Sequence, residues 1–306
     1  MEDIERRGLP KFFTDYIRFV EKEAIEEYEE FIDDRKEVAT PTANPNGGAV
    51  IAGDIITLSC ATEGAVIYYT TDGTTPTSES TLYVDGIEIN EATTVKAIAV
   101  RKLMTSEVLS VSYTMVPAVV FSELDTYLKS LAENTASTPY KIKVTGLTKT
   151  DCGNAATTGT LGNVIYSNNK KYVDLSYTEL PNDLTDLTNA FAYCGSLIVA
   201  PPIPNGVQNL NYAYTYCESL VNAPTIPNGV QNINSTFEHC GSLISAIINL
   251  ESVNPSRMQT LFWYCNNLQD VYVTSEEIKA TLIANNNDYF IFPKSLDLDT
   301  VIKVMD

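Results

Sequence analysis

The chain has 306 residues, of which 44% are hydrophobic, so it is long enough to form two or three folded domains. Its formal net charge of −19 disfavours a nucleic-acid partner, because affinity for DNA or RNA comes largely from Lys and Arg side chains that neutralise phosphates. The same charge disfavours binding to anionic membranes, and no stretch of the sequence reaches the length of a transmembrane helix.

Residues 1–37 are predicted to form one long amphipathic helix. Apolar residues recur at intervals of three and four in this segment, namely Phe13, Tyr16, Ile17, Val20, Ala24, Tyr28 and Phe31. A helix with so polar a surface needs something to pack against. Two interpretations stay open: the helix packs on its own chain, or residues 1–36 form an arm that makes homo-oligomers or anchors the chain to a virion platform.

The segment 38–116 is predicted to form a β-sandwich. It begins with a linker rich in Pro, Thr and Asn over residues 38–46, after which the apolar residues Ile56, Leu58 and Cys60 alternate with polar ones. Residues 64–77, GAVIYYTTDGTTPT, and the later VKAIAV at 95–100 resemble the immunoglobulin-like domain found at the C-terminal end of chitobiases. This resemblance implies a spacer module rather than a catalytic one.

The strongest pattern is a repeat of 23 residues within 181–306. The copy LTNAFAYCGSLIVAPPIPNGVQN at 187–209 is followed by copies at 210–232 and 233–255, and a degenerate copy begins at Met258 after a two-residue insertion. A period of 23 falls within the range of leucine-rich repeats. Residues 117–180 are predicted to form an α/β cap, because the open end of a repeat stack needs to be covered.

Each copy places a Cys three residues after an aromatic residue and then a Ser-Leu pair or a close variant, and the first two continue to Ile-Pro. This pattern resembles the BspA-type leucine-rich repeats of bacterial surface proteins. The resemblance implies a short solenoid with a C-terminal cap. The fold expected for the chain is therefore mainly β, with an N-terminal α-helix, an immunoglobulin-like β-sandwich and a short capped leucine-rich-repeat solenoid.

Four of the six cysteines occupy the same position in successive repeats: Cys194, Cys217, Cys240 and Cys265. Equivalent side chains of stacked repeats point the same way, so we expect a column of buried, reduced thiols rather than disulfides. The ligands do not converge as a zinc site requires, and His239 is the only histidine. The sequence therefore predicts neither a metal nor a cofactor.

One residue before each of these cysteines lies a ring: Tyr193, Tyr216, His239 and Tyr264, with Trp263 beside the last. These five residues are the candidate binding residues, because exposed rings at regular intervals suit a protein or glycan partner on a cell surface. The alternative interpretation is an aromatic stack that only stabilises the repeats.

No catalytic motif is apparent, since the chain lacks a Gly-rich phosphate loop and a nucleophile elbow and has a single His. We therefore expect a non-enzymatic surface-display or adhesion protein, extracellular or on the cell surface if a signal peptide was trimmed. One alternative is a structural protein of a bacteriophage virion, a head or tail fibre anchored by its N-terminal helix, if Met1 is the native start. A second alternative is an accessory fragment of a glycosidase.

Overall fold

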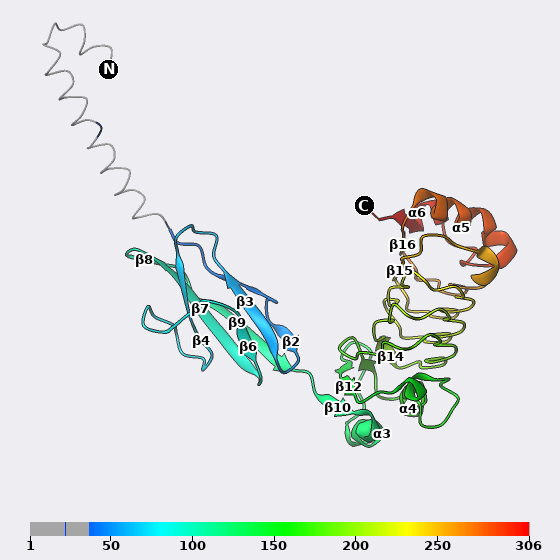
Figure 1. Cartoon of the computed structure of the whole chain (residues 1–306), viewed down its shortest axis with the longest axis horizontal. Helices are drawn as coiled ribbons and strands as arrows, with labels where there is room; N and C mark the ends of the chain where they lie inside the picture. The colour runs from blue at the N-terminus through cyan, green and yellow to red at the C-terminus, as the bar shows by residue number, and fades with distance from the viewer. Residues whose placement is uncertain (1–21, 23–36, 306) are drawn as a thin grey trace, which may run out of the picture. The chain divides into compact units, whose positions relative to one another are not determined.

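The computed structural model of the protein describes residue 22 and residues 37–305, and the chain divides into two compact units, Met1–Met115 and Val116–Asp306 (Figure 1). The helix predicted for residues 1–37 lies almost wholly outside the described residues. The described part is mainly β, as predicted. None of its helices combines the length and the apolar character needed to cross a membrane.

The first unit contains two β-sheets. The smaller sheet is antiparallel, with the order β1 (Thr42–Asn44), β3 (Asp54–Ser59) and β6 (Ile87–Ile89). The larger sheet has the order β2 (Gly48–Val50), β9 (Leu109–Met115), β7 (Thr93–Arg101), β4 (Val66–Thr70) and β5 (Thr81–Leu82), and β8 (Met104–Thr105) pairs with β7.

Alternation of apolar and polar residues places one side of each of these sheets in a shared core. In β3, Ile56 and Leu58 are buried while their neighbours are exposed, and Val95 of β7 lies in the same core. Tyr113 of β9 is buried and donates a hydrogen bond from its hydroxyl to the carbonyl of Pro45 at 2.7 Å. This hydrogen bond links the segment before β2 to β9 of the larger sheet.

The second unit begins with a segment of mixed structure. Its elements are β10 (Ala118–Val120), α3 (Phe121–Ser130), β11 (Tyr140–Lys141), β12 (Lys143–Thr145), the 3₁₀ helix η1 (Lys149–Cys152), α4 (Leu161–Ser167) and β13 (Val173–Asp174). Helix α3 buries Leu124 and Leu128 against the core of this unit. Helix α4 begins after Thr160, whose side chain accepts a hydrogen bond from the Asn163 backbone N–H.

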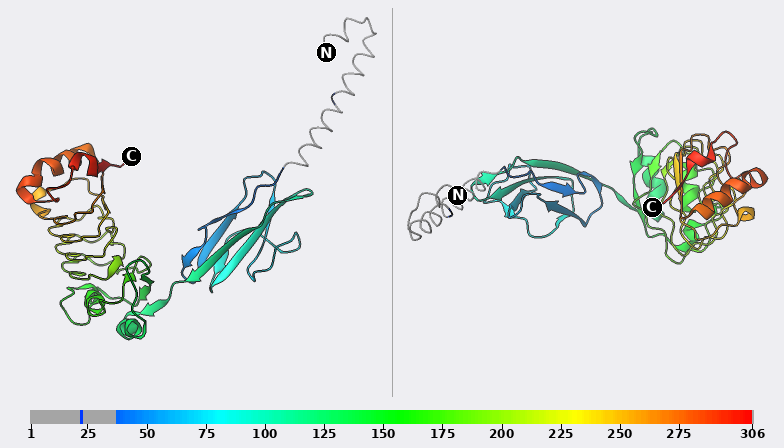
Figure 2. Two further views of the ribbon diagram at one scale, coloured as in Figure 1. Left: turned by 180° about the vertical axis from the view of Figure 1, so that it is seen from behind. Right: turned by 90° about the horizontal axis from the view of Figure 1, so that it is seen from above.

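Short parallel strands then run along one side of the repeats (Figures 1 and 2). Strands β11, β13 and β14 (Leu197–Val199) pair in this order, and β15 (Ser245–Ile248), β16 (Asp270–Val273) and β17 (Ile302–Val304) follow. Parallel bridges from Val199 to Asn222 and from Asn222 to Ser245 link the two groups. The remaining elements are η2 (Pro255–Arg257), α5 (Glu276–Tyr289) and α6 (Leu298–Val301).

Equivalent residues of successive repeats lie beside one another in this unit. The backbone N–H of Leu187 donates to the carbonyl of Asn209, and the N–H of Leu210 donates to Asn232 in the same way, each across 22 residues. Inside the stack, a column of buried rings comprises Phe191, Tyr214, Phe237, Phe262 and Phe292, with centroids of neighbours 5.3–5.6 Å apart. The leucines of the repeats, Leu197, Leu220, Leu243 and Leu268, are buried in the same core.

Candidate functional site

The rings that precede the repeat cysteines form a second stack on the outside of the repeats. We call Tyr193, Tyr216, His239 and Tyr264 the ring column. Their centroids lie 5.0, 4.3 and 4.2 Å apart in this order, with neighbouring planes within 18° of parallel. Tyr193 and Tyr264, at the two ends, are 58% and 49% exposed, and the two central rings are half-buried. The column therefore presents a continuous aromatic edge to solvent.

Every residue of the ring column has a left-handed backbone. The φ angles are 64° at Tyr193, 57° at Tyr216, 59° at His239 and 65° at Tyr264. This conformation is uncommon outside Gly, Asn, Asp and His, so it is least expected at the three tyrosines. A hydrogen bond to the next repeat accompanies it, since the N–H of Tyr216 donates to the carbonyl of Glu238 at 2.8 Å. The backbone turns the ring outward while the Cys that follows points into the core.

Trp263 does not belong to the ring column. It is half-buried and meets Tyr264 edge-on, with planes at 74° and centroids 5.4 Å apart. Its other edge contact is with Phe290, at the C-terminal end of α5, with centroids 5.1 Å apart. The structure thus brings four of the five candidate residues into one stack and places the fifth beside its last member.

A second column of left-handed residues was missed by the sequence analysis. It comprises Asn189, Tyr212, Ser235 and Thr260, four residues before each ring of the column. Tyr212 is 45% exposed. The repeat spacing contains this position, but only Asn189 has a side chain that favours the conformation, so residue type did not reveal it.

The thiols of the repeats connect neighbouring copies. All four are buried and free, as predicted, and Cys217, Cys240 and Cys265 each donate to the carbonyl of the core ring one repeat earlier, at 3.1, 3.1 and 2.9 Å. Burial raises the pKa of Cys194 to about 12 and that of Cys217 well above its usual range. These thiols are protonated at neutral pH and are therefore poor nucleophiles.

A pocket lies at the end of the ring column nearest α4. We call it the terminal pocket; it has a volume of about 560 Å³. Its lining comes from the loop before α4, from α4 itself and from the first repeat: Asn154, Ala155, Ala156, Asn163, Tyr166, Asn189, Ala192 and Tyr193. The sequence showed only a small, polar loop here, because the pocket depends on two segments that meet in the fold.

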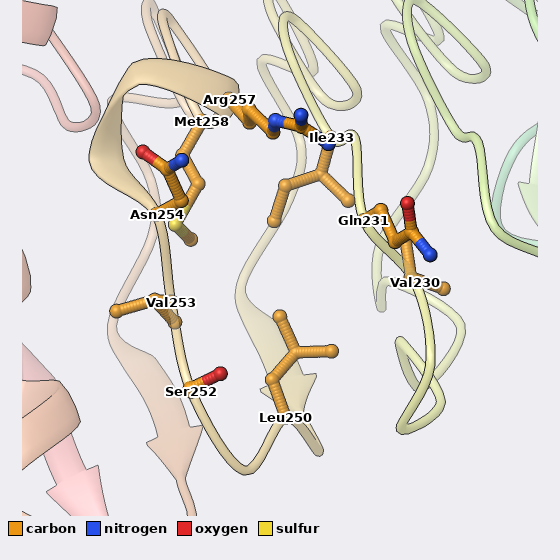
Figure 3. Close-up of a pocket in the computed structure, with 9 residues that line it drawn as sticks. All are labelled: Val230, Gln231, Ile233, Leu250, Ser252, Val253, Asn254, Arg257 and Met258. Carbon is orange, nitrogen blue, oxygen red and sulfur yellow. The ribbon is translucent and has the colours of Figure 1, made fainter.

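A smaller pocket of about 260 Å³ lies where the two-residue insertion interrupts the repeat (Figure 3). Figure 3 shows the side chains of Ile233, Leu250 and Met258 around this hollow, with Arg257 extending along one edge. Arg257 is the only charged residue that lines it. Neither pocket thus holds an acid–base pair, and within residues 37–305 no three His, Cys, Asp or Glu side chains are grouped to hold a metal ion.

Comparison with known proteins places one part of the chain. Residues 45–112 match the family described as the chitobiase/beta-hexosaminidase C-terminal domain. This match confirms the resemblance seen in the first unit and identifies its two sheets as an immunoglobulin-like fold. The searches of curated proteins and of solved structures found no match.

Proposed function

We propose that this protein is a non-enzymatic display protein that binds a protein or a glycan at a cell surface through its ring column. In this proposal the repeats form a leucine-rich-repeat solenoid of the BspA type, and the immunoglobulin-like unit is a spacer. The backbone hydrogen bonds and parallel bridges between successive repeats support the solenoid. The match of the first unit to a C-terminal module, rather than to a catalytic domain, supports the spacer.

The observation that carries the proposal is a ring on left-handed backbone in four successive repeats. A left-handed residue other than Gly costs roughly 1–3 kcal/mol. Each stacked contact in the ring column returns only about 0.5–1.5 kcal/mol, and the column has three of them. Over four residues and three contacts these ranges overlap, and Ser235 and Thr260 adopt the same backbone without a ring, so the conformation belongs to the repeat itself. What distinguishes the ring column is that this position holds an exposed or half-buried ring in every repeat, and such rings dominate binding energy when a partner covers them.

The test compares two variants that preserve the left-handed backbone. Tyr216→Gly combined with Tyr264→Gly removes two rings of the column, and Tyr212→Gly removes an exposed ring on the same kind of backbone outside it. We expect the fluorescently labelled double variant at Tyr216 and Tyr264 to lose attachment to bacterial cells, whereas the Tyr212→Gly variant attaches like the parent. If both variants lost attachment, or if neither did, the ring column would have only a structural role.

The family match also supports a second candidate, an accessory part of a glycosidase. In that case the chain carries no hydrolytic activity of its own but binds the polymer that a catalytic partner cleaves. Attachment to purified polysaccharide in the absence of cells would favour this candidate over binding to a surface protein.

A further inference from the structure

We propose that the terminal pocket binds the terminal residue of a neutral glycan. This inference rests on the proposed function for one residue, Tyr193, which belongs to both the pocket and the ring column. The other lining residues come from α4, from the loop before it and from the first repeat, so the pocket has chemistry of its own. Its volume of about 560 Å³ lies in the usual range for small-molecule sites.

The lining combines apolar surface with neutral polar groups. Tyr166 and Tyr193 are 51% and 58% exposed, and Ala155, Ala156 and Ala192 add apolar groups to the lining. A pyranose ring has a C–H face that packs against apolar and aromatic surface, and hydroxyls around its rim that need polar partners. The pocket offers both kinds of contact within one concave surface.

Several of the polar groups are free to meet a ligand. Within the described part of the chain, the side-chain amide of Asn189 and the hydroxyls of Tyr166 and Tyr193 make no hydrogen bond. An amide and a hydroxyl each donate and accept, which matches the dual character of a sugar hydroxyl. Asn163 has a structural role, because its side-chain amide donates to the Ala155 carbonyl at 3.0 Å and so fixes the loop before α4 against the helix.

The charge of the lining decides which glycans fit. None of the lining residues is Asp, Glu, Lys, Arg or His. A carboxylate, sulfate or ammonium group entering the pocket would lose hydration without gaining an opposite charge, which disfavours charged sugars and charged peptide side chains. A neutral sugar loses only hydroxyl hydration, and the free amide and hydroxyls replace it.

Close packing fixes the two sides of the pocket relative to each other. The backbone N–H of Ala155 donates to the carbonyl of Asn189 at 2.9 Å, and the Cys194 thiol donates to the carbonyl of Gly162 at 3.3 Å. At Gly162 a Cβ atom would lie 1.9 Å from the carbonyl oxygen of Ala190, so α4 approaches the first repeat as closely as a backbone can. A pocket held in this way binds without the entropy cost of ordering a loop.

Three single substitutions of the full chain test the pocket. Ala156→Trp fills it from an exposed position, and Asn189→Gly deletes the free amide while retaining the left-handed backbone at φ 57°. Thr158→Trp adds the same bulk to an exposed position of that loop outside the lining and is the matched control. The probe is an array of neutral oligosaccharides ending in glucose, galactose, mannose or N-acetylglucosamine, together with sialylated and sulfated counterparts.

We expect the parent chain to bind neutral members of the array and to bind their charged counterparts weakly or not at all. In calorimetric titration with the best neutral oligosaccharide, Ala156→Trp and Asn189→Gly should each raise Kd by roughly tenfold or more, and Thr158→Trp should leave it unchanged. Binding to no neutral glycan, preference for charged glycans or for peptides, or a parent-like Kd for Ala156→Trp would each overturn the proposal.

The same proteins separate this inference from the proposed function. If the pocket proposal alone is wrong, Ala156→Trp attaches to cells like the parent while the double variant at Tyr216 and Tyr264 does not. If only the ring column is wrong, the double variant attaches to cells like the parent, and Ala156→Trp still loses affinity for the short neutral glycan.

Discussion

The rings of Tyr216 and His239 stack with their centroids 4.3 Å apart and their planes within 8°, and both residues have left-handed backbone, with φ angles of 57° and 59°. The repeat therefore carries the same uncommon conformation under each ring. Because ring stacking and backbone strain oppose each other, substitutions that change one and leave the other can separate them.

Tyr216→Gly and Tyr216→Ala should differ in stability although both remove the ring. Glycine relieves the left-handed strain at φ 57°, whereas alanine retains it. We therefore expect the free energy of unfolding of the alanine variant to be lower than that of the glycine variant by roughly 1 kcal/mol. Urea unfolding of the two variants beside the parent measures this. Equal stabilities would mean that the backbone at this position relaxes once the ring is gone.

Tyr214→Phe should stabilise the second unit. The Tyr214 hydroxyl is buried without a hydrogen-bond partner, and the equivalent residues, Phe191, Phe237 and Phe262, have none to satisfy. An unsatisfied buried hydroxyl costs about 1–3 kcal/mol, so its removal should raise the melting temperature by a few degrees. Tyr216→Phe, which removes a hydroxyl from a half-buried ring, is the control and should melt like the parent. A lowered melting temperature for Tyr214→Phe would reveal a partner for this hydroxyl.

Alkylation should distinguish the cysteines by their burial. Cys60 is half-buried in the first unit, whereas Cys152, Cys194, Cys217, Cys240 and Cys265 are buried. With iodoacetamide at pH 8 we expect Cys60 to react in the native protein and the other five only after unfolding, because the reaction needs an exposed thiolate. Intact and peptide mass spectrometry give the count and the positions. Native modification of Cys217 would contradict the buried thiol column.

Alkaline pH should destabilise the second unit through the same thiols. Burial raises the pKa of Cys152 and Cys194 to about 12, while an unfolded thiol ionises near pH 8.5. The unfolded state then releases protons that the folded state keeps, so this stability is complete below about pH 8.5 and falls as the pH rises towards 12. Urea unfolding at pH 7.5 and 9.5 measures the fall, and Cys217→Ala should show a smaller one. If the free energy of unfolding of Cys217→Ala fell as much between these pH values as that of the parent, Cys217 would be excluded as a contributor.

Gly162→Ala should destabilise the contact between α4 and the first repeat. The added Cβ would meet the Ala190 carbonyl oxygen at 1.9 Å, and the shift this forces should cost roughly 1–3 kcal/mol. Gly241→Ala is the matched control, because nothing lies within 4 Å of a Cβ at that position. We expect the control to unfold like the parent in urea. A parent-like Gly162→Ala would indicate that α4 can move away from the repeat.

The sequence alone predicted the thiol column inside the repeats. Because the copies recur every 23 residues, equivalent side chains must stack if neighbouring copies pair, and the burial of Leu220, Cys217 and Phe237 follows from their apolar character. The immunoglobulin-like unit was likewise predictable, since its strands alternate at a period of two and its turn residues lie between them.

Only the tertiary structure decided what surrounds the rings. Trp263 occupies the repeat position before the ring column, and the structure places its ring edge-on against Phe290 at the end of α5, a contact that the repeat does not predict. The terminal pocket likewise depends on Ala155 and Asn189 meeting across the interface of α4 and the first repeat. Repetition in a sequence dictates which side chains stack within the repeats, but a pocket between unlike segments arises from their close approach, which no spacing along the chain encodes.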